Sequence, residues 1–152
     1  MTQLRRRTFL KGALATAVAA LGAGLHKPLR ALGAEWPKDA FASKEIEEAL
    51  KALYGSTQTS ASGSIKIKAP LQAENGAVVP ISVSTTLPNV QSIAVLVEKN
   101  PHPLVAQVNF NRTEGFFSSR IKMGATSDVY CVVKCGGKLY TAKQNVKVTV
   151  GG

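Results

Sequence analysis

The 152-residue sequence has little of what a metal site requires, because it contains only two cysteines and two histidines. From residue 35 onward the candidate ligands of this kind are Cys131, Cys135 and His102. A structural zinc site takes about four such ligands, and a blue-copper site takes two histidines and a cysteine. No glycine-rich phosphate-binding loop follows a predicted strand. We therefore expect neither a metal nor another cofactor.

The sequence also lacks an arrangement of side chains that indicates catalysis. His102 lies in a Pro-His-Pro turn, a setting typical of a solvated surface histidine, and Glu114 and Asp128 do not have the spacing of a catalytic pair. By motif, the chain is not predicted to be an enzyme. A reactive thiol at Cys131 stays open as an alternative.

The two cysteines are badly placed to form a disulfide with each other. Cys131 and Cys135 are four residues apart in a predicted strand, which separates them by about 13 Å. A disulfide tolerates Cα atoms no more than about 7 Å apart. We interpret both as small side chains buried on the same strand face.

Acidic residues are missing from the first 34 residues, and this shapes the net charge of +10. Six of the 19 basic residues lie in that stretch, so the remainder holds 13 basic and 9 acidic residues, a net charge of +4. No basic run with interleaved aromatic residues occurs there. Nucleic-acid binding is therefore not predicted.

The longest apolar run, from Gly12 to Leu25, has 14 residues, whereas a membrane-spanning helix needs about 20. Basic residues precede it, which is typical of an export signal. The residues before the run resemble a twin-arginine export motif: Arg6, Arg7, Phe9, Leu10 and Lys11. We predict that residues 1–34 are a signal cleaved near Gly33 or Ala34 and that the mature protein is periplasmic, without a membrane anchor. An uncleaved anchor is the alternative.

Residues 35–56 are predicted to form one helix. Four apolar residues recur at the helical spacing i, i+3, i+4 and i+7, namely Ile46, Ala49, Leu50 and Leu53. Asp39 or Ser43 can cap the start of this helix, and Gly55 can end it. The polar residues 56–64 that follow are typical of a linker.

Residues 64–150 show about seven short strands separated by turn signals, the pattern of an immunoglobulin-like β-sandwich. The fold class is therefore predicted to be all-β with one N-terminal helix. Asn75-Gly76 and Gly136-Gly137 indicate tight hairpin turns. Pro80 indicates an edge strand or a bulge, because proline cannot donate a ladder hydrogen bond.

The last predicted strand runs into a pair of glycines, Gly151 and Gly152. Glycine loses more conformational freedom on ordering than any other residue. We therefore expect these two residues to be loose. A frayed terminus explains such a tail as simply as a functional one does.

Three segments closely resemble the SoxY family, the sulfur carriers of bacterial thiosulfate oxidation. They are "AENGAVVPISV" from Ala73, "LPNVQSIAVLVEKNPHPLVAQVNF" from Leu87, and "SSRIKMGATSDVYCVVKCGGKLYTAKQNVKVTVGG" from Ser118. The twin-arginine leader fits the family as well. The resemblance implies an immunoglobulin-like fold and a heterodimer with the β-sandwich subunit SoxZ, which would travel as a passenger of the folded-cargo signal.

The resemblance also implies a mechanism. Members of the family end in a Gly-Gly-Cys-Gly-Gly arm whose cysteine carries sulfur intermediates to SoxXA-, SoxB- and SoxCD-type enzymes. Gly151 and Gly152 match the first two residues of that arm, and the carrier cysteine is expected directly after them; it is not among these 152 residues, which favours the scaffold alternative below. Lys143 or Lys147 is hypothesised to hold an anionic adduct. Strands carrying Phe116 and Phe117 are candidates for partner contact. A non-carrier scaffold domain is the alternative function.

Overall fold

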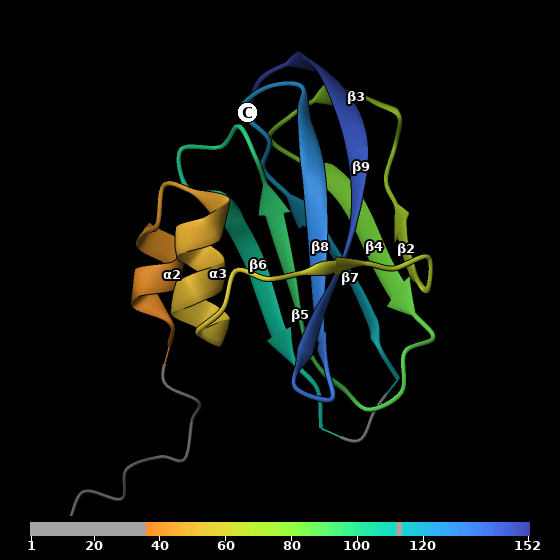
Figure 1. The fold of residues 1–152 in the computed structure, drawn as a ribbon. Coiled ribbons are helices and arrows are strands. Elements are labelled where there is room, and N and C mark those ends of the chain that lie inside the picture. Colours follow the sequence, from red (N-terminus) through yellow and green to blue (C-terminus); the bar gives the residue numbers. More distant parts are fainter. Residues whose placement is uncertain (1–35, 112–113) are drawn as a thin grey trace, which may run out of the picture. The chain divides into compact units, whose positions relative to one another are not determined.

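The computed structural model describes residues 36–111 and 114–152 (Figure 1). The predicted export signal, with Arg6, Arg7, Phe9, Leu10 and Lys11, lies outside these described residues. Every helix and strand given below belongs to one compact unit, Pro37–Gly152. Among the described residues, no helix has the length and apolar character needed to cross a membrane.

The unit is a sandwich of two β-sheets with two short helices, which confirms the predicted all-β fold class (Figure 1). One sheet has the strand order β1-β9-β8-β5-β6, with β3 also paired to β9, and the other has the order β2-β4-β7. The elements are α2 (Lys38–Ala42), α3 (Ile46–Tyr54), β1 (Ser60–Ala61), β2 (Ile65–Lys68), β3 (Gln72–Asn75), β4 (Val79–Thr85), β5 (Val90–Val97), β6 (Leu104–Asn109), β7 (Phe116–Ile121), β8 (Ser127–Cys135) and β9 (Lys138–Val150).

Nine strands are present in this part of the chain, where the sequence pattern predicts about seven. The additional strands are β1, which lies in the predicted linker, and β3, and both pair in parallel with β9. They have two and four residues. Two residues cannot show a period-2 alternation, and β3, with the sequence Gln-Ala-Glu-Asn, has only one apolar residue.

The main core lies between the two sheets and follows the alternation of the strands. In β4 the side chains of Val79, Ile81 and Val83 point inward and are fully buried. Strand β5 lies between β6 and β8, and Ser92 to Val97 are buried on both of its faces. Both faces are buried because α2 and α3 cover the outer face of the larger sheet, where Leu50 packs with Leu96.

The helical region differs from the prediction, because two short helices replace the single helix. Ser43 lies between them, and its Oγ donates a hydrogen bond to the Asp39 carbonyl (2.8 Å). Neither Asp39 nor Ser43 therefore caps a helix start; α3 begins after Glu45 without a side-chain cap. Gly55 ends α3 as predicted, with φ of 71° and its N–H donated to the Lys51 carbonyl. Glycine adopts this left-handed conformation at no steric cost.

The two predicted hairpin turns have different outcomes. Gly136 and Gly137, with φ of 56° and 76°, join β8 to β9 in a two-residue hairpin, as predicted. The turn at Asn75-Gly76 is not a hairpin, because β3 pairs with β9 and β4 pairs with β2 and β7. The Asn75 side chain accepts a hydrogen bond from the Ala77 N–H (2.8 Å) and turns the chain from one sheet to the other.

Pro80 lies in β4, the central strand of the smaller sheet, and not in an edge strand or a bulge as predicted. Strand β2 ends at Lys68, which is paired with Ser82. At Pro80 the strand therefore has a neighbour on one side only, β7. A proline is tolerated there because no ladder partner lies on the other side to require its missing N–H.

Candidate functional site

The two terminal glycines are positioned by β9, the longest strand. This strand runs for 13 residues from the β8–β9 hairpin to Val150; it is paired with β8 from Lys138 to Val146 and, at its end, with β3. Gly151 and Gly152 follow directly at the end of the sandwich marked C in Figure 1. Both are exposed to solvent.

Three backbone hydrogen bonds connect this end of the chain to two neighbouring turns. The Gly76 N–H donates to the Val150 carbonyl (2.8 Å), the Met123 N–H donates to the Gly76 carbonyl (2.7 Å), and the Gly152 N–H donates to the Met123 carbonyl (3.1 Å). We call these four residues, Gly76, Met123, Val150 and Gly152, the terminal clamp. The expectation that the glycine pair is loose is therefore wrong for Gly152, whose backbone is held.

The terminal clamp also shows why glycine occupies these positions. A Cβ added to Gly151 would overlap the carbonyl of Gly124, and one added to Gly152 would overlap the backbone of Gly76 and Ala77. Gly76 is equally constrained, because its Cβ would overlap the Met123 carbonyl. None of the three has a positive φ. Glycine is required here because the backbones approach closely, and not because of a special backbone conformation.

Side chains from other loops hold the Met123 loop in place. Asn100 donates from Nδ2 to the Lys122 carbonyl (2.8 Å) and accepts the Gly124 N–H at Oδ1 (2.9 Å). Thr126 accepts the Val148 N–H at Oγ1 (2.9 Å), which ties the same loop to β9. Sequence reasoning missed Asn100, Met123 and Thr126, because their roles depend on contacts between loops that are distant in the chain.

The lysines of β9 do not gather at the terminal clamp. Lys143 forms an ion pair with Asp128 (3.0 Å) and lies over the Tyr130 ring, 5.6 Å from its centre. Hydrogen bonds from Asn145 and Lys143 hold the pKa of Asp128 below its usual value. Lys143 already has an anionic partner, which makes it a poor candidate for holding an adduct. Lys147 is exposed on β9.

The two cysteines are free thiols in different surroundings. Cys131 is fully buried between the sheets, as predicted, and this burial raises the pKa of its thiol to about 12. Almost none of it is thiolate near neutral pH, so the arrangement argues against Cys131 as a nucleophile. Cys135 is only half-buried, contrary to the prediction, and its Sγ donates to the Pro88 carbonyl (2.7 Å).

His102 contacts the backbone of the helical region, and its hydrogen-bond partners in the described part of the chain are carbonyl groups. Its ring is exposed, and Nδ1 lies 3.1 Å from the Ala42 carbonyl and 3.2 Å from the Ser43 carbonyl, at the end of α2. An Nδ1–H in this position donates to carbonyls that the helix leaves unpaired. Within residues 36–111 and 114–152, no three His, Cys, Asp or Glu side chains are placed together as metal ligands.

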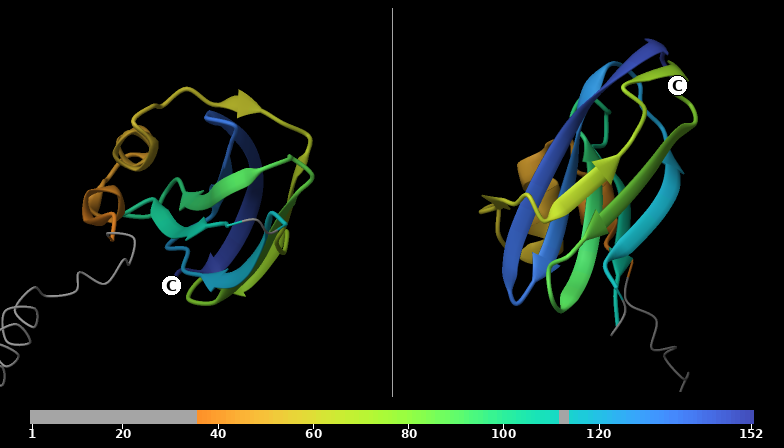
Figure 2. Two further views of the ribbon diagram at one scale, coloured as in Figure 1. Left: turned by 90° about the horizontal axis from the view of Figure 1, so that it is seen from below. Right: turned by 90° about the vertical axis from the view of Figure 1, so that its right-hand side faces the viewer.

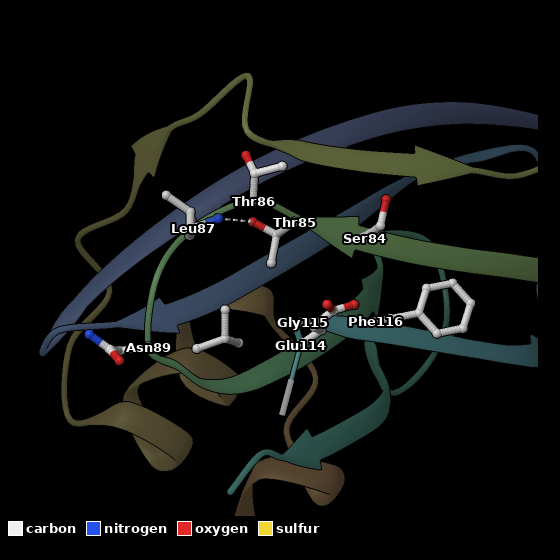
Figure 3. A pocket seen from close by; sticks show the side chains of 9 residues that line it. Ser84, Thr85, Thr86, Leu87, Asn89, Glu114, Gly115 and Phe116 are labelled. Carbon is white, nitrogen blue, oxygen red and sulfur yellow. Dashed lines mark hydrogen bonds between the residues drawn. The ribbon is translucent and has the colours of Figure 1, made fainter. Parts of the chain in front are cut away.

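A pocket of about 670 Å³ lies where β4 ends and β7 begins, at the other end of these strands from the terminal clamp (Figure 3). Three of its nine lining residues carry hydroxyl groups, and Thr85 Oγ1 accepts the Leu87 N–H (3.2 Å). Among the described residues that line it, Glu114 is the one ionisable side chain. With no nucleophile paired to a base, this lining does not indicate a catalytic site.

Comparison with known proteins gives one strong family match. The family model described as sulfur oxidation protein SoxY matches residues 50–152. A solved structure of the sulfur carrier protein SoxY from Chlorobium limicola f thiosulfatophilum is 39% identical, with a TM-score of 0.64, and the match covers 70% of this chain and 97% of that one. No curated protein matches the chain significantly.

Two further solved structures are matched only weakly. One comes from a study of T-cell activation by the superantigen toxic shock syndrome toxin-1; it is 12% identical, with a TM-score of 0.41, over 55% of this chain and 98% of that one. The other is an engineered protein, also 12% identical, with a TM-score of 0.40, over 57% of this chain and 20% of that one. Neither bears on function.

Proposed function

The chain belongs to the SoxY family of sulfur oxidation proteins, and from this premise we propose that it carries sulfur intermediates covalently on a terminal arm. Gly151 and Gly152 are the first two residues of this Gly-Gly-Cys-Gly-Gly arm, and the carrier cysteine follows directly after Gly152. The observation that supports this proposal most is the terminal clamp, which fixes the start of the arm at the surface of a rigid sandwich.

The terminal clamp divides the arm into a fixed start and a mobile tip. Gly152 is exposed while its N–H is bound to Met123, so residues that follow it enter solvent from a defined point. Each mobile residue adds about 3.5 Å of reach, and ordering it in an enzyme costs about 1–2 kcal/mol. Fixing two residues in advance removes their share of that cost at every visit to an enzyme.

The carrier has no catalytic activity of its own in this proposal. A cysteine on a mobile arm reacts as the thiolate, and the chemistry is performed by SoxXA-, SoxB- and SoxCD-type enzymes that receive the arm in turn. Cys131 is buried, and the Cys135 thiol is hydrogen-bonded to the Pro88 carbonyl, so neither is suited to enter another active site. The glycines flanking the carrier cysteine let the arm pass through a narrow channel.

We further propose that the protein works in the periplasm as one subunit of a heterodimer with a SoxZ-like β-sandwich. The twin-arginine motif at Arg6 and Arg7 supports export in a folded state, which would let a bound subunit without its own signal travel along. In this proposal the mature protein binds neither nucleic acid nor a membrane. Residues 1–34 are the cleaved signal, and residues 64–150 form the sandwich.

Intact-protein and peptide mass spectrometry of the protein from its native host, grown on thiosulfate, tests the carrier role. We expect sulfur-containing adducts on the cysteine after Gly152, which a reducing agent removes. The Cys131→Ala variant is the matched control and keeps the adducts, whereas replacing the terminal cysteine by serine abolishes them. If neither the cysteine after Gly152 nor Cys131 carried an adduct, and thiosulfate oxidation were unimpaired after gene deletion, the scaffold alternative would be established instead.

A further inference from the structure

The two sheets of the sandwich differ in what covers their outer faces. Helices α2 and α3 pack on the larger sheet, and their apolar residues form a second core with Ala94, Leu96 and Val132. Among the described residues, no helix packs on the smaller sheet, β2-β4-β7, whose outer face is open (Figure 2). We call this surface the open face.

The register of the strands defines which side chains form the open face. Three rows cross the sheet, pairing Ser84 with Phe116, Ser82 with Ser118, and Pro80 with Arg120. Lys66 and Lys68 of β2 extend the first two rows. The centre of the face is polar and has small side chains, with the Ser82 and Ser118 Oγ atoms 2.9 Å apart. Phe116 is its one large apolar side chain and is 59% exposed.

The charges of the open face have one sign. Its outward positions carry Lys66, Lys68 and Arg120 and no acidic residue. None of these three cations forms an ion pair with the described residues, in contrast to Lys143, which is paired with Asp128. Four of the acidic side chains lie in the helical region, namely Asp39, Glu45, Glu47 and Glu48, and Glu114 lines the pocket beside the Ser84–Phe116 row. A surface whose outward charges all have one sign steers oppositely charged partners.

The open face is also adjacent to the terminal clamp. The pair Val79–Ile121, next to the Pro80–Arg120 row, is separated from Gly76 by two residues and from Met123 by one. A partner docked on these strands would therefore lie beside the point where the proposed arm leaves the body. An arm of a few residues, at about 3.5 Å each, reaches such a partner without displacement of the sandwich.

The size and polarity of the open face indicate a short-lived complex. Three strands about 4.8 Å apart and about 20 Å long cover on the order of 300 Å². A stable interface buries about 800 Å² per partner, and permanent interfaces are more hydrophobic than this surface. Serine, proline and unpaired cations around one aromatic residue suit a partner that binds and leaves.

We propose that the open face docks an acidic surface of an enzyme partner in a transient, salt-sensitive complex that presents the arm to that enzyme. The inference rests on the proposed carrier function, because that function supplies the need for repeated enzyme visits. The docking partner is recognised by carboxylate groups that complement Lys66, Lys68 and Arg120, with Phe116 as the apolar contact at the far row.

The test compares two triple charge reversals in the full chain bound to its SoxZ-like subunit. One is Lys66→Glu/Lys68→Glu/Arg120→Glu, and the matched control is Lys38→Glu/Lys44→Glu/Lys138→Glu, which makes the same change in net charge at exposed positions elsewhere. Stopped-flow association with purified SoxXA-, SoxB- and SoxCD-type enzymes is measured at about 20 mM and about 300 mM salt. Circular dichroism checks that both variants are folded.

We expect the open-face variant to associate with at least one enzyme at least about tenfold more slowly at low salt, and to lose most of the salt dependence. The control should change the association rate by less than about twofold. Equal effects of both variants, or association that is independent of salt in the unmodified protein, would overturn the proposal. The proposal would also be overturned if the open-face variant lost only its binding to the SoxZ-like subunit, or only its self-association, and still associated normally with the enzymes.

The two proposals fail in different ways. If the carrier function is wrong, the unmodified protein shows no sulfur adduct after Gly152, whatever its docking behaviour. If only the docking inference is wrong, adducts form in the unmodified protein and both charge variants accept sulfur at equal rates.

Discussion

At the scale of single residues, glycine is needed at different positions for different physical reasons. Gly136 and Gly137 provide the positive φ angles of a hairpin, whereas Gly76, Gly151 and Gly152 provide space for backbones that approach closely. The sequence pattern reveals the first role, because two glycines between alternating strands are typical of a turn. The second role depends on what lies opposite, which sequence order does not show.

Cys131 gives a prediction about alkaline stability. Its pKa in the folded protein is about 12, above its ordinary value of 9.0. The folded state therefore binds this proton more tightly than the unfolded state, and the resulting stability is complete below about pH 9 and is lost as the pH rises toward 12. We expect this thiol to contribute a fall of about 1.4 kcal/mol per pH unit across that interval.

Urea unfolding of the unmodified protein and of Cys131→Ala, between pH 7 and pH 11, isolates this contribution. The variant should be less stable at neutral pH because it leaves a small cavity, and the difference should shrink above about pH 9. Other titrating groups affect both proteins alike. A difference that stays constant over the whole range would show that Cys131 keeps an ordinary pKa when folded.

At the scale of elements, β9 connects the parts of the molecule. It pairs with β8 from Lys138 to Val146 and with β1 and β3 in parallel, so that one strand organises the edge of the larger sheet. Its end is further fixed by the turn between β3 and β4, where Gly76 contacts both Val150 and Met123. The rigidity that the carrier proposal requires therefore comes from this turn as much as from the strand.

Gly76→Ala tests the importance of this turn. The added methyl group overlaps the Met123 carbonyl and approaches the Gly152 nitrogen (2.9 Å). Overpacking against backbone costs about 1–3 kcal/mol, and we expect that loss in urea unfolding together with faster amide hydrogen exchange at Gly152. Gly63→Ala is the matched control, because a Cβ there meets nothing within 4 Å. If both variants were equally stable, the turn would be more pliable than its contacts indicate.

At the scale of the whole molecule, the two sheets differ in the charges on their outer faces and in whether helices pack on them. The larger sheet and its helices carry side chains of both charges, whereas the outward charged side chains of the smaller sheet are all cations. The net charge of +10 conceals this division, since six of its basic residues belong to the first 34 residues. The surface that carries the docking inference becomes visible only once the strands are arranged.

Stability and the carrier function should be separable at this scale. Removing all residues after Val150 deletes one backbone hydrogen bond, from Gly152 to Met123, and no buried side chain. A hydrogen bond contributes about 0.5–1.5 kcal/mol net, so the truncated protein should unfold only slightly more easily. We expect it to lose sulfur loading completely in mass spectrometry. A truncation that prevents folding would mean that the terminal clamp is essential to the sandwich itself.

The sequence by itself determined the class of fold, the hairpin at Gly136-Gly137, the buried β5 strand and the family, because local periodicity, turn chemistry and motif identity are properties of neighbouring residues. Only the tertiary structure decided that β1 and β3 join β9, that the Asn75-Gly76 turn passes between sheets, and that Gly152 is held by Met123. These features arise from contacts between segments far apart in the chain, and no local pattern encodes which backbone will lie opposite a given residue.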